Sequence, residues 1–208
     1  MNSLSKFKTN GILKLNLFGT RLDLIHSNNK CDFPPNLQIS STHEKEYSVS
    51  LVLQILNGFQ NAQNLSKLNI YICNADFKSQ ILLKELISKV SKFNNLFELR
   101  LPLENYDGFQ TDIIKLLQSL KKLVYVYFQS KTITDAISLN ELIQYAVHHK
   151  SELRLLYFNL CQPIKIADTQ NINRVYPLEV ILEVKQNGFT KEFYFFDTRY
   201  GVTSCLHS

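Results

Sequence analysis

Apolar side chains recur along this chain in a short pattern that is typical of a strand running into a tight turn. The pattern places apolar residues at positions one, four and six, and a small polar residue or cysteine at position nine. It is clear from Leu65, Leu96 and Leu153, and weaker from Ile12 and Pro34. Because side chains alternate across a strand, positions three, five and seven face the side opposite the buried positions.

One strand, expected at 120–129, has two open registers. The first turns Leu123 and Tyr125 inward. The second, slipped by one residue, turns Val124, Val126 and Phe128 inward. A one-residue slip exchanges the two faces of a strand, so the choice decides which side chains are buried. The apolar residues favour the slipped register, but the sequence leaves both open.

The segments between the strands have helical periodicity. Their apolar residues recur every three or four positions, which gives each segment one wide buried face. The predicted helices cover 47–59, 77–93, 109–120 and 136–148. Strand and helix therefore alternate, and an α/β repeat of this kind requires stacked neighbours to bury both sides of each unit.

The C-terminal stretch breaks this rhythm. Two β-rich runs, 175–184 and 189–196, bracket Asn187 and Gly188, which is a strong signal for a two-residue hairpin turn. The simplest register places Val180 and Leu182 beside Phe195 and Phe193, and Glu183 opposite Glu192. Because two glutamates opposite each other are unfavourable, a bulge or a shifted register stays open. We expect this hairpin to form an antiparallel cap on the last unit.

At Leu65 to Cys73 and Leu153 to Cys161 the pattern resembles the leucine-rich repeat family, in particular its ribonuclease-inhibitor-like type. This resemblance implies a curved α/β solenoid with parallel strands on the concave side and helices on the convex side. It also implies protein binding and no reaction. We expect residues 1–174 to form the solenoid and 175–208 the β-hairpin cap, packed as one domain.

Composition and charge limit the classes of partner and the cell compartments that we expect for this chain. The net charge of +5, from 23 basic and 18 acidic residues, is scattered, which argues against nucleic acid. The 4 cysteines form no CxxC pair, which favours a reducing intracellular setting, taken as the cytoplasm. A basic N-terminus without acidic residues over 1–22 keeps a mitochondrial transit peptide open as an alternative. No apolar run is long enough to predict a membrane span.

The candidate reactive residues are better explained as structural ones. Cys73 and Cys161 fall at the turn position, where a small buried side chain is expected. His148 and His149 end a helix and are adjacent, so they do not share a face for a metal. The segment that ends at His207 is assigned to a frayed tail. We therefore predict no enzyme, no metal and no cofactor.

The predicted binding surface is the concave strand face. With the first of the two registers at 120–129, its outward positions are Lys67, Asn69, Tyr71, Glu98, Arg100, Lys122, Leu155, Tyr157 and Asn159. Tyr71, Arg100 and Tyr157 would form a central strip, and tyrosine and arginine are enriched at interface hot spots. The aromatic run 193–196 is assigned to packing inside the cap. We predict a non-catalytic protein-binding scaffold or a structural subunit of a larger assembly. The alternatives are an adaptor for signalling or targeted degradation, and an RNA-associated subunit that uses scattered lysines and arginines.

Overall fold

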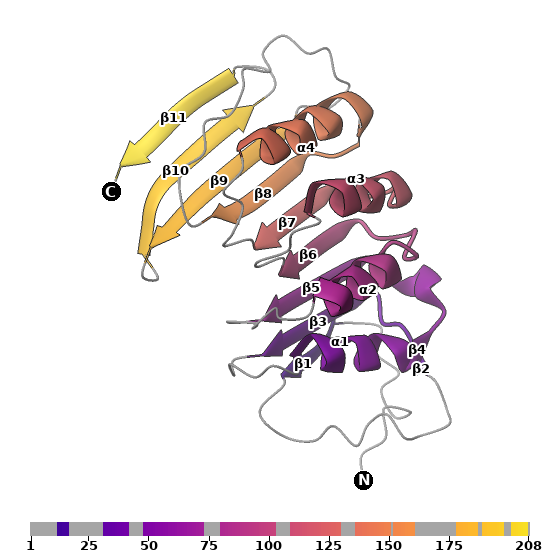
Figure 1. Ribbon diagram of the computed structural model, residues 1–208. Helices are drawn as coiled ribbons and strands as arrows, with labels where there is room; N and C mark the ends of the chain where they lie inside the picture. Colours follow the sequence, from indigo (N-terminus) through magenta and orange to yellow (C-terminus); the bar gives the residue numbers. More distant parts are fainter. Residues whose placement is uncertain are drawn as a thin grey trace.

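The chain folds as an α/β structure built on one large sheet (Figure 1). The structure is a computed structural model. It describes residues 12–16, 31–41, 48–72, 80–102, 109–129, 136–150, 152–160, 178–186, 189–197 and 201–207. The predicted turn residues Cys73, Cys161, Asn187 and Gly188 lie outside this part of the chain.

Within the described residues the main sheet has 9 strands, and their order in space follows their order in sequence. Pairing is parallel from β1 to β9 and antiparallel from β9 to β11. The strands are β1 (Ile12–Asn16), β3 (Asn36–Ser41), β5 (Lys67–Ile72), β6 (Glu98–Pro102), β7 (Tyr125–Gln129), β8 (Leu155–Leu160), β9 (Glu179–Gln186), β10 (Phe189–Asp197) and β11 (Gly201–His207). A separate small sheet pairs β2 (Cys31–Asp32) with β4 (Phe59–Gln60), and a short 3-10 helix, η3 (Ala62–Asn64), precedes β5.

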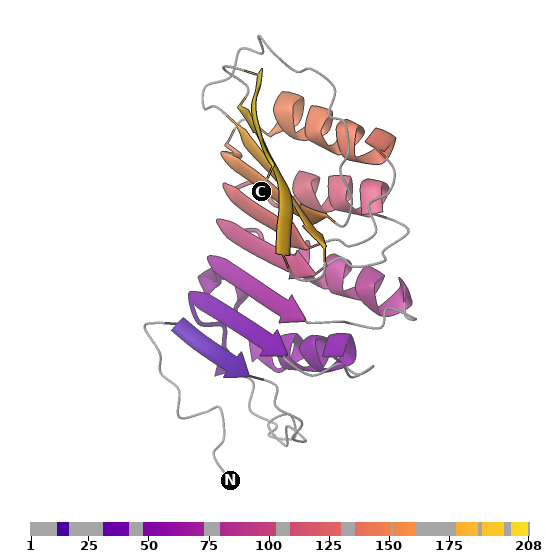
Figure 2. The same ribbon diagram turned by 90° about the vertical axis from the view of Figure 1, so that its left-hand side faces the viewer.

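The helices all lie on one side of the main sheet, as the two views in Figures 1 and 2 agree. They are α1 (Ser48–Asn57), α2 (Gln80–Val90), α3 (Phe109–Ser119) and α4 (Ala136–His149). The core fills the layer between helices and strands, where strand residues such as Leu68 and Ile70 are 0% exposed. The predicted alternation of strand and helix is confirmed.

The entry into each strand repeats the same backbone hydrogen bonds. The carbonyl oxygens of Pro35, Ser66, Phe97 and Val124 each accept two N–H groups from the start of the next strand. The leucine before each of these strands is fully buried and donates its N–H to the carbonyl three residues earlier, at Leu65, Leu96, Leu123 and Leu153. Strands β5, β6, β7 and β8 therefore begin with one shared local geometry.

The register of β7 corrects one of our two expectations. Val126 and Phe128 are 0% exposed and face the helices, as in the slipped register, although Val124, which that register also turned inward, is half-buried. Leu123, which the first register turned inward, is 0% exposed and lies before the strand. Val126 pairs with Leu99 on one side and Leu156 on the other, which keeps one continuous apolar row. The register that turned Tyr125 inward is wrong. Tyr125 is half-buried and pairs with Glu98, so it does not belong to the buried apolar row.

The C-terminal strands extend the same sheet. β9 pairs with β8 in parallel and with β10 antiparallel, and Gln186 pairs with Phe189. A register shift between Thr190 and Glu192 sets Glu183 opposite Phe193, so the simplest register is wrong and the bulge that was left open is present. The predicted frayed tail is also wrong, since β11 pairs with β10.

In the described residues no helix has the length and apolar character needed to cross a bilayer.

Candidate partner-binding face

The side of the main sheet opposite the helices, here called the open face, is covered by no helix of the described residues (Figure 2). Strand register aligns its side chains in rows. The central row is Gln38, Asn69, Arg100, Tyr127, Tyr157 and Ile181. The flanking row is Asn36, Lys67, Glu98, Tyr125, Leu155 and Glu179. Every residue in both rows is half-buried, whereas the residue between the two rows in each strand is buried. These buried residues are Leu37, Leu68, Leu99, Val126, Leu156 and Val180.

Arg100 lies at the middle of the open face, between two aromatic rings. Its guanidinium carbon is 4.9 Å from the centroid of the Tyr71 ring and 4.3 Å from that of Tyr127. The Tyr127 ring is 5.8 Å from the ring of Tyr157. A cation over an aromatic face contributes about 0.5 to 2 kcal/mol, depending on how far it is desolvated. These contacts hold the arginine in one orientation across three strands.

Three polar atoms on this face are buried and have no hydrogen-bond partner among the described residues. They are the Nε of Arg100 and the Oδ1 atoms of Asn69 and Asn36. A buried donor or acceptor without a partner costs about 1 to 3 kcal/mol. The open face therefore holds unmet hydrogen-bonding capacity of both kinds, one donor and two acceptors.

The flanking row carries opposite charges that pair. Lys67 Nζ lies 3.1 Å from Glu98 Oε2, and the Lys67 side chain is 41% exposed. Further along, the exposed ring of Phe97 meets Tyr125 edge-on, with centroids 5.2 Å apart. Aromatic surface therefore continues from the central row onto the flanking row.

The phenol of Tyr127 stays protonated well above neutral pH. Burial raises its pKa above the usual 10.0, and the negative charge of Glu98 adds to this rise. The nearby Arg100 cation acts in the opposite direction. At neutral pH the hydroxyl is a neutral hydrogen-bonding group at the centre of the face.

Most of the predicted surface residues meet on this face. Lys67, Asn69, Glu98, Arg100 and Leu155 occupy neighbouring row positions. Tyr71 contacts Arg100 directly, whereas Tyr157 is linked to Arg100 through the ring of Tyr127. The side chain of Asn159 lies outside the described residues, and only its pairing with Gln129 is defined.

Lys122 was assigned to the open face, and this assignment is wrong. It precedes β7, is exposed, and donates from Nζ to Asn95 Oδ1 at 2.8 Å. Tyr125 and Tyr127 take the outward positions instead. Both were missed because the pattern was started at Leu120, although Leu123, Val126 and Phe128 reproduce the one, four, six spacing.

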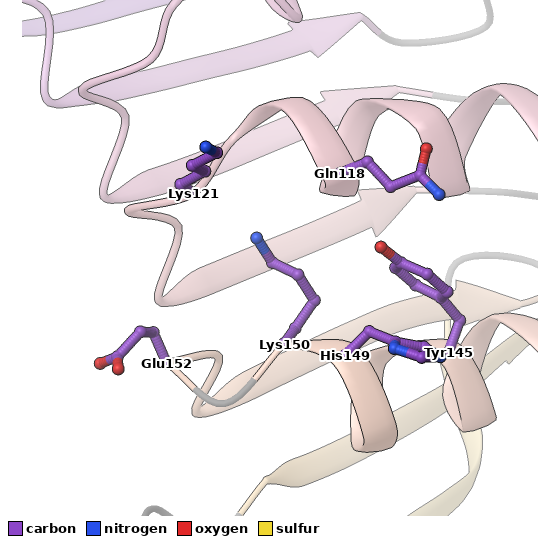
Figure 3. A pocket seen from close by; sticks show the side chains of 6 residues that line it. All are labelled: Gln118, Lys121, Tyr145, His149, Lys150 and Glu152. Carbon is purple, nitrogen blue, oxygen red and sulfur yellow. The ribbon is translucent and has the colours of Figure 1, made fainter.

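A second feature lies on the helix side, between the C-terminal ends of α3 and α4. This cavity has a volume of about 320 Å³. Figure 3 shows the side chains that line it, which are Gln118, Lys121, Tyr145, His149, Lys150 and Glu152. Lys150 is 7% exposed, and its Nζ donates to the Leu120 carbonyl at 2.8 Å. Burial lowers the pKa of this amine below 10.5. The Leu120 carbonyl follows the end of α3 and also accepts the N–H of Leu123, so Lys150 supplies a second and shorter hydrogen bond to it.

No protein-family model matches this chain, and neither the curated proteins nor the solved structures compared with it gave a match. The arrangement of the open face is therefore the basis for a functional proposal. Among the described residues no group of three or more histidine, cysteine, aspartate or glutamate side chains is placed to hold a metal ion.

Proposed function

We propose that this chain is a non-catalytic protein-binding scaffold or a structural subunit of a larger assembly, and that it binds its partner through the open face. The proposal rests on the environment of Arg100. Arg100 is held between Tyr71 and Tyr127, yet its Nε has no acceptor among the described residues. A side chain fixed at some energetic cost in the free protein is suited to a partner that supplies the missing contact.

The composition of the face supports a protein partner. Tyrosine and arginine are the residue types most enriched where binding energy concentrates, and rigid rings lose little conformational entropy on binding. Tyr71 and Tyr127 contact Arg100, and the aromatic surface continues from Tyr127 to Tyr157 in the central row and, at the entry into β6 and β7, through Phe97 and Tyr125. Polar residues at Asn36, Lys67 and Glu98 border this aromatic patch. An aromatic centre with a polar rim is the usual anatomy of a protein interface.

We further propose that the architecture is a leucine-rich-repeat-like solenoid, with β9, β10 and β11 as its end cap. The repeated strand entries at Ser66, Phe97 and Val124 support this proposal. Register partners on successive parallel strands are 24 to 31 residues apart, from 24 between Leu13 and Leu37 to 31 between Leu37 and Leu68, which is close to the period of about 20 to 29 residues in such repeats.

The experiment is affinity purification of the tagged full chain from its native cells, with recovered proteins quantified by mass spectrometry. The test variant combines Arg100→Ala with Tyr127→Ala. The control variant combines Lys84→Ala with Lys115→Ala, two exposed lysines on α2 and α3. Thermal unfolding by circular dichroism confirms that each variant is folded before it is used.

We expect the wild type and the control variant to recover the same proteins. The open-face variant should lose them by about tenfold or more, because hot-spot truncations commonly cost 2 kcal/mol or above. Equal recovery by the open-face variant would reject this face as the binding surface. Loss in the helix-side control alone would assign binding to the opposite side.

A further inference from the structure

The charge pattern of the open face singles out Arg100. In the central row it is the one residue with a formal charge among Gln38, Asn69, Arg100, Tyr127, Tyr157 and Ile181. In the flanking row the Lys67 amine is already paired with Glu98. In the described part of the chain no carboxylate lies within ion-pair distance of Arg100. The centre of the face therefore carries one positive charge that its neighbours do not neutralise.

The geometry around Arg100 selects the kind of group that can meet this charge. The guanidinium carbon lies over the rings of Tyr71 and Tyr127, so these rings cover part of the guanidinium. Its N–H groups point outward in the guanidinium plane, and a partner that accepts hydrogen bonds from them must lie in that plane. A carboxylate matches this edge, since its two oxygens accept parallel hydrogen bonds in the same plane.

The two unpaired asparagine oxygens add a second requirement. Asn69 is the register partner of Arg100, and Asn36 is the register partner of Lys67 on the next strand. Their Oδ1 atoms need hydrogen-bond donors. A polypeptide offers backbone and side-chain N–H groups beside its carboxylates, so one segment can supply both the acceptor for Arg100 and the donors for the two asparagines. A single carboxylate also matches the one unpaired positive charge, whereas a nucleic acid brings a negative charge at every nucleotide.

We propose that the open face takes an acidic segment of a partner polypeptide. An aspartate or glutamate carboxylate of that segment pairs with Arg100 between Tyr71 and Tyr127, and N–H groups of the segment donate to Asn69 and Asn36. This inference rests on the proposed protein-binding function and specifies the chemistry of the partner. The acidic-segment inference and the protein-binding proposal are overturned by different experimental results.

The test is selection of random linear peptides on the full chain, in parallel with Arg100→Gln and with a Tyr127→Ala, Tyr157→Ala variant. Arg100→Gln removes the charge and keeps a long polar side chain, so it is the sharper variant. Selected peptides are then resynthesised with each acidic residue replaced by its amide. A single-stranded polyuridine RNA is titrated against the same proteins as the competing class of ligand.

We expect peptides selected by the wild type to be enriched in aspartate and glutamate, and this enrichment to disappear on Arg100→Gln. Replacing the paired acid by its amide should weaken binding to the wild type by about 30-fold or more, and leave binding to Arg100→Gln nearly unchanged. Arg100→Glu should instead select basic peptides. Thermal unfolding again confirms that the variants are folded.

The other outcomes separate the two proposals. Peptides that need Tyr127 and Tyr157 but show no acidic preference would overturn the acidic partner and leave the protein-binding face standing. Peptides that bind all variants equally would count against both. Failure to select any peptide, or RNA binding that depends on Arg100, would overturn the acidic-polypeptide inference.

Discussion

The two faces of one sheet are built from alternate residues of the same strands, and they are satisfied to very different degrees. On the helix side Leu99, Val126 and Leu156 form a row in which every side chain is 0% exposed. On the open face the next residues in the chain are Arg100, Tyr127 and Tyr157, all half-buried. The same strands therefore carry a fully buried apolar core on one side and a half-buried polar and aromatic surface on the other.

This difference separates stability from binding. Apolar burial stabilises the fold by about 25 cal/mol per Å² removed from water, so the helix side accounts for the folded state. The open face contributes little to that term and retains the unpaired Nε of Arg100. Substitutions on the two faces should therefore divide cleanly between loss of fold and loss of partner.

The largest expected effect is on the helix side, at Phe158. This residue is 0% exposed, and its ring centroid lies 5.6 Å from that of Phe128. Phe158→Ala should lower the free energy of unfolding by about 3 to 5 kcal/mol, because it removes buried surface and leaves a cavity. Urea denaturation measures the loss.

The matched control is Tyr157→Ala, one residue earlier in the chain and on the open face. It should cost about 1 kcal/mol, as most substitutions outside the core do. Equal losses at Phe158 and Tyr157 would contradict the division between the faces.

A smaller effect is expected at Lys150, where α4 meets the end of α3. Lys150→Met removes the N–H donor to the Leu120 carbonyl and should destabilise the fold by about 1 kcal/mol at neutral pH. Chemical denaturation of both proteins at one ionic strength measures this difference.

The pH dependence of this difference has a definite sign. Burial places the folded-state pKa of Lys150 below the usual 10.5, so between these two values the unfolded chain holds more protons. Wild-type stability should therefore rise relative to Lys150→Met as the pH increases through that window. No change over the same window would show that the amine is solvated in the folded state, and a relative fall would show that its pKa is raised rather than lowered.

The ion pair between Lys67 and Glu98 should matter less. Glu98→Gln is expected to cost below about 1 kcal/mol, because the pair is exposed to solvent on one side and screened by salt. A double-mutant cycle with Lys67→Met at low and high salt isolates the coupling energy. A coupling that does not weaken with added salt would contradict this assignment.

The smallest effect on stability should come from the residue most important for binding. Arg100→Gln removes the cation–π contacts with Tyr71 and Tyr127, which is unfavourable, and the buried unpaired Nε, which is favourable, so the two effects offset each other and the unfolding free energy should stay within about 0.5 kcal/mol of the wild type. Thermal and urea unfolding check this expectation. A loss above about 2 kcal/mol would make Arg100 a structural residue rather than a binding one.

The sequence was sufficient to predict the layers of this fold. Leu68, Leu99 and Leu156 repeat at fixed positions within their units, and each predicted helix shows a periodic apolar face. The alternation of strands and helices can therefore be inferred from the sequence alone. Burial on one side of a strand is strong enough to be visible as a pattern. The open-face positions of Lys67, Asn69 and Glu98 followed directly from that alternation.

The centre of the open face was harder to predict for a physical reason. Leu120 and Leu123 are both fully buried three residues apart, but Leu120 closes α3 by donating to Leu116 O, whereas Leu123 begins the turn into β7. Apolar spacing alone does not separate these two roles. Tyr127 was therefore missed, and with it the second ring around Arg100.

The strand β11 was also missed, since 201–207 has few β-branched or aromatic residues to mark it.

Chemical modification of tyrosines in the native complex tests the central claim most directly. Tyr127 and Tyr157 on the open face and Tyr145 on α4 are all half-buried, so they form an internal comparison. Nitration is quantified by mass spectrometry for the free chain and for the chain bound to its co-purified partner. Binding through the open face predicts that nitration of Tyr127 and Tyr157 falls several-fold in the complex while that of Tyr145 is unchanged. Protection of Tyr145, with Tyr127 and Tyr157 as reactive as in the free chain, would contradict it.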